Sequence, residues 1–322
     1  MTAAIRKDAG GGGILLQAGS CSVIVVPHLG GKIASICVNG NELLQAPLAV
    51  YAPRTLTMPF DASDASGWDE CLPSVAGCTV KTANGLAAIP DHGDLWRVEW
   101  TEQKAMNAQE GTITLRGECF SLPLVLDRTL TLAEMENGWQ LGLSYKLTNT
   151  GNYPVPWSWA AHPLFTVEEG DRIVLPYSIT GLNLEGSTGN RLGRNGDQVN
   201  WPIATIPQGG DIDLSLAHPP ESGIGEKLFA GPLATSENWC ALERRLAGLR
   251  IRAEFEPRAT PYLGLWICYG GWPDRPGPKQ VCVAMEPATA PVDSLAQAGF
   301  WSRILPPGVS YSWPMVVDFE LL

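Results

Sequence analysis

The sequence predicts an all-β protein, built as a large antiparallel β-sandwich. Apolar and polar residues alternate over much of the chain, while long helical periodicity is missing. The 35 glycines and 26 prolines are spread along the whole chain, so turn signals recur without forming one linker. Because large β-sandwiches often exceed the average domain length, we predict a single domain over residues 1–322.

Eight segments have the alternation or the short β-rich composition of strands. In chain order they are residues 21–27, 32–38, 112–118, 124–149, 249–257, 263–270, 281–287 and 311–322. Asn39-Gly40 is a hairpin signal after the second segment, and Glu136-Asn137-Gly138 divides the longest segment into two strands. The stretch from Gly181 to Gly225 is the most irregular, and we expect it to be a long excursion over the surface.

Composition excludes several classes of function. A formal net charge of −11 argues against a nucleic-acid partner, which needs an excess of Lys and Arg. The eight cysteines form no CxxC pair and are predicted to be reduced and mostly buried. The first 19 residues fit neither a signal peptide nor a membrane span, so a cytoplasmic protein is expected. The four histidines lack metal-ligand spacing and no phosphate-binding loop is present, so no metal or cofactor is predicted.

Two distant segments share one local pattern, an ionisable residue followed by proline. They are WSWAAHPLF, residues 157–165, which contains His162, and VCVAMEPAT, residues 281–289, which contains Glu286. Proline cannot donate to a sheet and restricts the residue before it to extended conformations. We therefore expect both strands to stop pairing there. A simple His-Pro turn and a solvated strand end are the alternatives.

Both ionisable residues are predicted to lie above small neighbours. Counting by twos, His162 shares a face with Ser158 and Ala160, and Glu286 shares a face with small residues two and four positions earlier. Small neighbours leave room for a ligand, and partial burial raises the pKa of a glutamate toward neutrality. Facing one cavity, the two residues would form an acid and base pair near pH 7.

Two further segments place polar residues beside aromatic ones. PDHGDLWRVEW, residues 90–100, contains His92 and Trp96, and SGWDECLPSV, residues 66–75, contains Trp68, Asp69 and Glu70. A polar turn and a solvated acidic loop are the alternatives. Indole rings stack on the C–H faces of sugars, and carboxylates and imidazoles bind their hydroxyls. With twelve tryptophans, most of them expected in the core, the mixture indicates a carbohydrate ligand.

These segments resemble the aldose 1-epimerase family of the galactose mutarotase-like superfamily. The resemblance follows the family's order through six segments that span nearly the whole chain: GGKIASICVNGNELL, PDHGDLW, HPLFTVEEGDRIVLP, YLGLWICYGG, MEPATAPVDSL and LPPGVSYSWPMVVDFE. It implies a β-sandwich of the galactose mutarotase-like type with a sugar site on a concave face. The implied reaction is the cofactor-free interconversion of the α and β anomers of an aldose.

The resemblance also implies roles for individual residues. The family's general acid corresponds to His162, its general base to Glu286, and a sugar-contacting histidine to His92. We further expect Asp69 or Glu70 to orient hydroxyl groups, and Trp68 or Trp96 to provide a stacking surface. The implied partner is a small sugar, with no nucleic acid or membrane involved and a monomer or homodimer as the assembly.

Two departures from the family leave the sugar open. GWDECLPSV stands where galactose mutarotases carry an Asn-Arg segment, and GIGEKLF places Lys227 where the family has a sugar-binding aspartate. One alternative is a hexose-6-phosphate mutarotase, in which Arg97, Lys227 and Arg303 would have to converge on the phosphate. Another is a carbohydrate-binding or regulatory protein that has kept the fold without catalysis.

Overall fold

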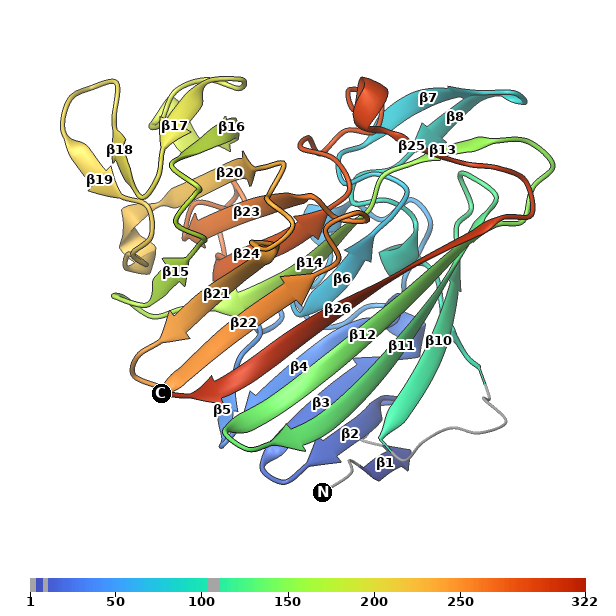
Figure 1. Cartoon of the computed structure of the whole chain (residues 1–322), viewed down its shortest axis with the longest axis horizontal. Helices are drawn as coiled ribbons and strands as arrows, with labels where there is room; N and C mark the ends of the chain where they lie inside the picture. Colours follow the sequence, from blue (N-terminus) through green and yellow to red (C-terminus); the bar gives the residue numbers. More distant parts are fainter. Residues whose placement is uncertain (1–3, 8–10, 104–110) are drawn as a thin grey trace.

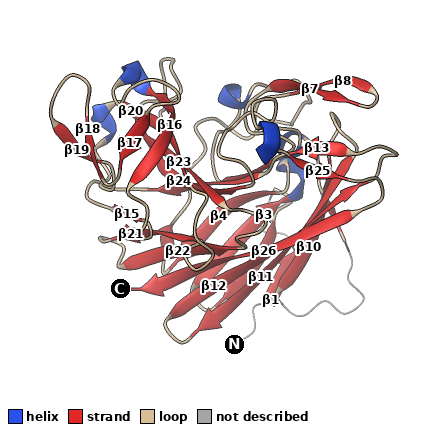
Figure 2. Cartoon of the chain, turned by 45° about the horizontal axis from the view of Figure 1, so that its top comes forward, coloured by secondary structure: helices blue, strands red, loops and turns tan. Residues whose placement is uncertain are grey.

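Two large antiparallel sheets dominate the structure (Figure 1). The computed structural model describes residues 4–7, 11–103 and 111–322, and of residues 4–7 only the backbone. Part of the N-terminal segment used above to predict the cellular location therefore lies outside the described residues. Strands make up about half of the chain, and the helices of the described ranges are only short turns between them (Figure 2).

The larger sheet has twelve strands in the described part of the chain. Its order is β1-β2-β3-β4-β6-β14-β24-β23-β20-β16-β17, with β5 beside β4. The bounds are β1 (Ala4–Lys7), β2 (Ile14–Ala18), β3 (Cys21–Val26), β4 (Lys32–Val38), β5 (Asn41–Glu42), β6 (Trp68–Cys71), β14 (Ala160–Thr166), β16 (Gly181–Ser187), β17 (Gln198–Asn200), β20 (Ile224–Ala230), β23 (Tyr262–Tyr269) and β24 (Val281–Ala288).

The smaller sheet has eight strands within the same described ranges, in the order β15-β21-β22-β26-β12-β11-β10-β9. They are β9 (Thr101–Glu102), β10 (Thr112–Glu118), β11 (Leu124–Met135), β12 (Gly138–Asn149), β15 (Arg172–Val174), β21 (Trp239–Arg244), β22 (Leu249–Phe255) and β26 (Ser310–Leu321). Three two-stranded sheets complete the described part of the fold: β7 (Cys78–Thr82) with β8 (Gly85–Ile89), β13 (Val155–Trp157) with β25 (Arg303–Leu305), and β18 (Ile203–Thr205) with β19 (Asp211–Asp213).

The described helices are single 3₁₀ turns. They are η1 (Pro27–Leu29), η2 (Phe60–Ala62), η3 (Leu95–Arg97), η4 (Thr188–Asn190), η5 (Pro220–Ser222) and η6 (Gly299–Trp301). None of them has the length or the apolar character needed to cross a membrane.

The predicted β-sandwich is confirmed, and so are its main strands. The segments 32–38 and 112–118 coincide with β4 and β10, and the long segment forms the hairpin of β11 and β12. Asn39 and Gly40 both have positive φ, as a tight hairpin turn requires. All eight cysteines are free thiols, five of them buried. The prediction for Gly181–Gly225 was partly wrong, because β16 pairs with β20 inside the larger sheet.

The core lies between the two sheets, and a polar network crosses it. Along β6, Trp68 and Glu70 point into this core. The fully buried Glu70 accepts hydrogen bonds from Arg128 Nη1 at 2.9 Å, from the Tyr145 hydroxyl at 3.1 Å and from Trp159 Nε1 at 2.9 Å. Since β11 and β12 belong to the smaller sheet, this network ties the two layers together.

The prediction that β14 and β24 stop at their prolines was also wrong. Both strands continue through Pro163 and Pro287, and each stays paired with its other neighbour, β6 or β23. Only the ladder between them is interrupted, because a missing N–H affects the one side of a strand toward which it would point. The register pairs Ala160 with Ala288 and Leu164 with Ala284 on either side of the interruption. His162 is therefore directly opposite Glu286.

Removing the buried cation that crosses the core should destabilise the fold strongly. In Arg128→Met, the carboxylate of Glu70 stays buried without its partner, so unfolding by urea should require about 3–5 kcal/mol less. The matched control is Arg116→Met, which breaks a half-exposed pair with Asp127 and should cost less than about 1 kcal/mol. Equal losses in both variants would contradict a structural role for the Glu70 network.

Candidate functional site

A cavity of about 460 Å³ opens on the face of the larger sheet that points away from the smaller one. This volume is within the range of roughly 300–1,000 Å³ that is typical of small-molecule sites. The lining combines imidazoles, carboxylates, one lysine and aromatic rings: Pro59, Phe60, Asp61, Val75, Ala76, Asp91, His92, His162, Lys227, Trp266, Trp272, Gln280, Glu286 and Asp293. These residues come from β14, β20, β23, β24 and the loops above them.

His162 and Glu286 meet at the floor of this cavity. His162 Nε2 is 3.8 Å from Glu286 Oε1, and both side chains are at least nine-tenths buried. Neither Glu286 Oε1 nor His162 Nδ1 has a hydrogen-bond partner within the described protein. The small residues Cys282 and Ala284 share the buried patch of Leu164 beside them, which confirms the predicted small neighbours of Glu286.

The environment shifts the pKa values of His162 and Glu286 in opposite directions. Burial lowers the pKa of His162 well below its ordinary value, and the positive charge of His92, Lys227 and Lys32 adds to this effect. Burial raises the pKa of Glu286, and the repulsion of Asp293 adds to this rise. The attraction of Lys227 lowers the pKa and offsets the rise only in part. The gap between their ordinary pKa values therefore narrows or reverses, so that the pair can hold one proton between them.

His92 forms the wall opposite the sheet. Its ring stacks on Phe60 at 3.7 Å between centroids and meets His162 edge-on at 5.2 Å. Its Nδ1 is 2.8 Å from Asp91 Oδ2, which leaves Nε2 free of that contact. Arg97 donates a hydrogen bond to the Asp91 carbonyl at 2.7 Å and another to the Met58 carbonyl at 3.1 Å, so the turn and the Phe60 segment are held together.

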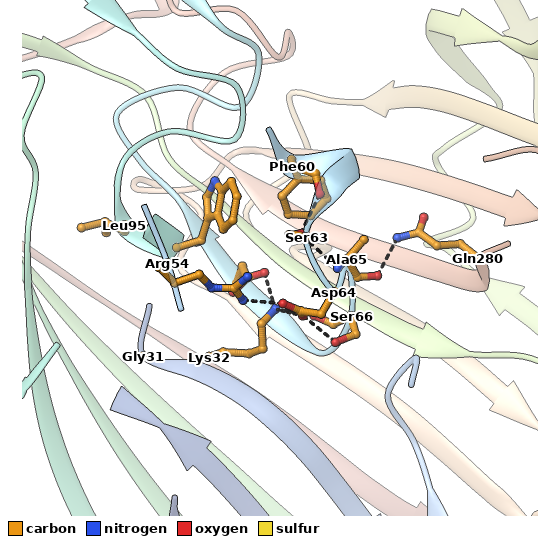
Figure 3. A network of polar contacts seen from close by, with 12 residues as sticks. Gly31, Lys32, Arg54, Phe60, Ser63, Asp64, Ala65, Ser66, Leu95 and Gln280 are labelled. Carbon is orange, nitrogen blue, oxygen red and sulfur yellow. Dashed lines mark hydrogen bonds and ion pairs between the residues drawn. The ribbon is translucent and has the colours of Figure 1, made fainter. Parts of the chain in front are cut away.

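A buried charge network anchors the Phe60 segment from below (Figure 3). Lys32 Nζ lies 3.3 Å from Asp64 Oδ2, and it also binds Asp69 and donates to the Ser66 carbonyl. The other oxygen of Asp64 pairs with Arg54. Four residues before Asp64 in the same segment is Phe60, which lines the cavity. The network therefore fixes the position of one cavity wall without contacting the cavity.

Four of the predicted sugar contacts lie outside the cavity. Trp68 and Glu70 point into the core between the sheets, and the Asp69 carboxylate is bound to Lys32. The ring of Trp96 is fully buried behind Phe60. These four are corrected to supporting positions: strand alternation turns Trp68 and Glu70 into the core, the ion pair with Lys32 holds Asp69, and Trp96 is buried in a 3₁₀ turn. Lys227 does line the cavity, but its ammonium group is paired with Glu286 and Asp293.

The aromatic lining comes from residues that were not among the predicted sugar contacts. Trp266 on β23 and Trp272 in the following loop are half-buried and line the cavity, together with Phe60. Asp293 lies seven residues after Glu286 in the same family-like segment, which was a usable signal. No sequence signal pointed to Phe60, because its segment has neither a hydrophobic periodicity nor a motif. Across the described ranges, no group of His, Cys, Asp and Glu gathers as a metal-ligand set.

Comparison with solved structures shows the fold. The Slr1438 protein of Synechocystis sp. PCC 6803 superimposes with a TM-score of 0.70 at 15% identity, over 98% of this chain and 97% of that one. A protein of Escherichia coli K12, provisionally described as an aldose 1-epimerase, gives a TM-score of 0.65 at 18% identity, over 96% and 98%. A galactose mutarotase related enzyme of Lactobacillus acidophilus gives a TM-score of 0.65 at 14% identity, over 96% of this chain and 99% of that one.

The chain therefore has the galactose mutarotase-like β-sandwich fold, as the resemblance implied. At these identities the similarity is one of fold, and function has to be argued from the site. No family profile matches the sequence, and no curated protein matches it either.

The turn that carries His92 should depend on Gly93. Gly93 has φ +69°, and a Cβ there would lie 2.2 Å from the Leu72 carbonyl oxygen. Gly93→Ala should lower the free energy of unfolding by about 2 kcal/mol or more, measured by urea denaturation. Gly223→Ala is the matched control, because Gly223 has φ +64° but open space around it. A Gly93 variant no less stable than the control would show that the close approach to Leu72 is unimportant.

Proposed function

We propose that the protein is an aldose 1-epimerase that interconverts the α and β anomers of an unphosphorylated hexose. The observation that carries the proposal is the unpartnered Glu286 Oε1 beside His162 Nε2, 3.8 Å apart on a cavity of sugar size. Mutarotation needs a base at the anomeric hydroxyl and an acid at the ring oxygen. Both oxygens are bonded to one carbon, so an acid and a base this close together can address both.

The reaction would proceed by opening and closing the ring. Glu286 accepts the proton of the anomeric hydroxyl, His162 delivers a proton to the ring oxygen, and the bond between that oxygen and C1 breaks. The free aldehyde turns about its C1–C2 bond. Ring closure on either face then returns one proton to His162 and the other to the anomeric oxygen. Each positioned group typically contributes roughly 10²–10⁴-fold to such proton transfers.

The lining supports a neutral sugar over a sugar phosphate. A phosphate site needed Arg97, Lys227 and Arg303 to converge, but Arg97 binds the carbonyl groups near Asp91 and Arg303 binds those near Arg258. Of the described lining residues, Lys227 alone is a lysine or arginine, and it stands among four carboxylates. Trp266, Trp272 and Phe60 add apolar surface of the kind that sugars stack on.

Removing either reacting group should abolish most of the activity. In His162→Ala and in Glu286→Gln, kcat for anomer exchange should fall by about 10²–10⁴-fold, because each variant lacks one of the two proton carriers. Polarimetry and anomer-exchange NMR on a panel of freshly dissolved aldoses measure this. His28→Ala and Glu118→Gln remove exposed residues of the same types and serve as controls.

Wild-type protein that accelerates none of the panel would overturn the proposed reaction. Sugar binding without any rate enhancement would instead favour the carbohydrate-binding alternative. Full activity in both site variants would assign the chemistry to other residues.

The pH dependence of kcat/KM should be bell-shaped. Because the pKa of His162 is lowered and that of Glu286 is raised, the pair holds one proton over a window between the two values. Below the window both residues are protonated and the base is lost. Above it both are deprotonated and the acid is lost. A profile that stays flat from pH 4 to 9 would contradict a single shared proton.

A further inference from the structure

Lys227 reaches Glu286 across an intervening strand. Lys227 lies on β20 opposite Trp266 of β23, and Glu286 lies on β24 opposite Gly264 of β23. The two charged side chains therefore meet over Gly264, where no side chain stands between them. A Cβ on Gly264 would lie 3.1 Å from Glu286 Oε2, which is tighter than an ordinary contact. The glycine thus makes room for the ion pair.

The contact distinguishes the two oxygens of Glu286. Lys227 Nζ donates a hydrogen bond to Oε2 and lies 3.3 Å from Asp293 Oδ1. The other oxygen, Oε1, has no hydrogen-bond partner in the described protein and is the one that faces His162 Nε2. One oxygen is therefore fixed by the lysine, while the other remains available for a ligand.

Asp293 is itself held firmly in place. Its carbonyl oxygen accepts hydrogen bonds from the backbone N–H groups of Val75 at 3.0 Å and Ala76 at 2.9 Å. The Ser74 hydroxyl also donates to that oxygen, at 3.2 Å. The second carboxylate at Lys227 is thus part of a fixed loop and not a freely moving surface group.

We propose that Lys227 is a positioning residue, which holds Glu286 as an oriented carboxylate base, and that Asp293 weakens this hold by sharing the ammonium group. The proposal rests on the proposed mutarotation, and it replaces the expectation that Lys227 binds the sugar. Two of the three N–H donors of the ammonium group face carboxylates, which leaves at most one for a hydroxyl.

Several other titratable groups face the ion pair of Lys227 with Glu286. They are His162 on β14, His92 in its turn, Cys71 on β6, Cys282 on β24, Glu185 on β16 and Asp293. Burial raises the pKa of both thiols well above the usual range, so they stay neutral. The charge around Glu286 and His162 is therefore governed by Lys227, Asp293, the two histidines and, at His162, Lys32, while Glu185 interacts with Asp293 and Lys227.

Substituting Lys227 and substituting Asp293 should shift the pH profile of kcat/KM in opposite directions. Lys227→Met removes the cation, so the shared proton is held more tightly and moves toward Glu286. The alkaline limb of the pH profile of kcat/KM should move to higher pH by about one unit or more. The maximal kcat/KM should fall about tenfold or more, with little change in KM. Asp293→Asn removes a repelling carboxylate, so the same limb should move to lower pH.

A direct titration separates this coupling from the reaction. Protein carrying ¹³C-labelled glutamate is titrated by NMR without sugar, and the Glu286 signal is assigned by its loss in Glu286→Gln. The pKa of Glu286 should rise in Lys227→Met and fall in Asp293→Asn. Gly264→Ala should shift it upward by a smaller amount, because the new methyl group displaces Oε2. Gly142→Ala is the matched control, since its Cβ would meet nothing closer than 3.7 Å.

Each outcome decides one of the two proposals. A raised KM in Lys227→Met, with the titration and the pH profile unchanged, would overturn the positioning role and return Lys227 to sugar binding. Shifts of the same sign in Lys227→Met and Asp293→Asn would overturn it as well. If Lys227→Met does not fold, the downward shift in Asp293→Asn decides. The expected titration shifts in a protein inactive on every aldose would support the coupling and overturn the reaction.

Discussion

Buried charge has to be compensated inside a protein, and this constraint organises the whole site. Three carboxylates on β6 and β24, the strands on either side of β14, are buried, and each meets a buried cation from a different element. The pairs are Asp69 with Lys32, Glu70 with Arg128, and Glu286 with Lys227. Without these cations, burial would drive the carboxyl groups toward their neutral forms. The pairs thereby tie β6 and β24 to β4, β11 and β20.

His162 is the exception to this pattern, and the proposed proton transfer depends on this exception. No carboxylate lies within hydrogen-bond distance of its ring, because the nearest, Glu286, is 3.8 Å away. The positive groups around it disfavour a second positive charge, and burial acts in the same direction. Its neighbour Glu286 binds protons more readily than an exposed glutamate does. These opposite shifts bring the proton affinities of the two residues closer together or reverse their order, and the proposed proton exchange with a substrate uses both residues.

The sequence predicted elements well and predicted contacts between elements poorly. Alternation located β4, β10 and the hairpin of β11 and β12, because a period of two is a local property. The His-Pro and Glu-Pro patterns selected two residues that share the cavity. Their opposition depends on the register of β14 with β24, which no local pattern encodes. Likewise, the contact of Lys227 with Glu286 depends on Gly264 standing between them on a third strand. Trp68 and Trp96 were selected by composition, which does not say toward which layer a ring points.

Lys227 also limits which ligands the cavity can accept. A phosphate or a sugar carboxylate would need the ammonium group of Lys227, yet two carboxylates already occupy it. Displacing either one would leave a negative charge uncompensated in a largely buried position, at a cost of several kcal/mol. Hydroxyl groups make no such demand, since they can donate to Asp61, Asp91 and Glu286 Oε1 without displacing a cation. The ion pair of Lys227 with Glu286, which orients the base in the proposed reaction, therefore also favours a neutral, hydroxyl-rich ligand over an anionic one.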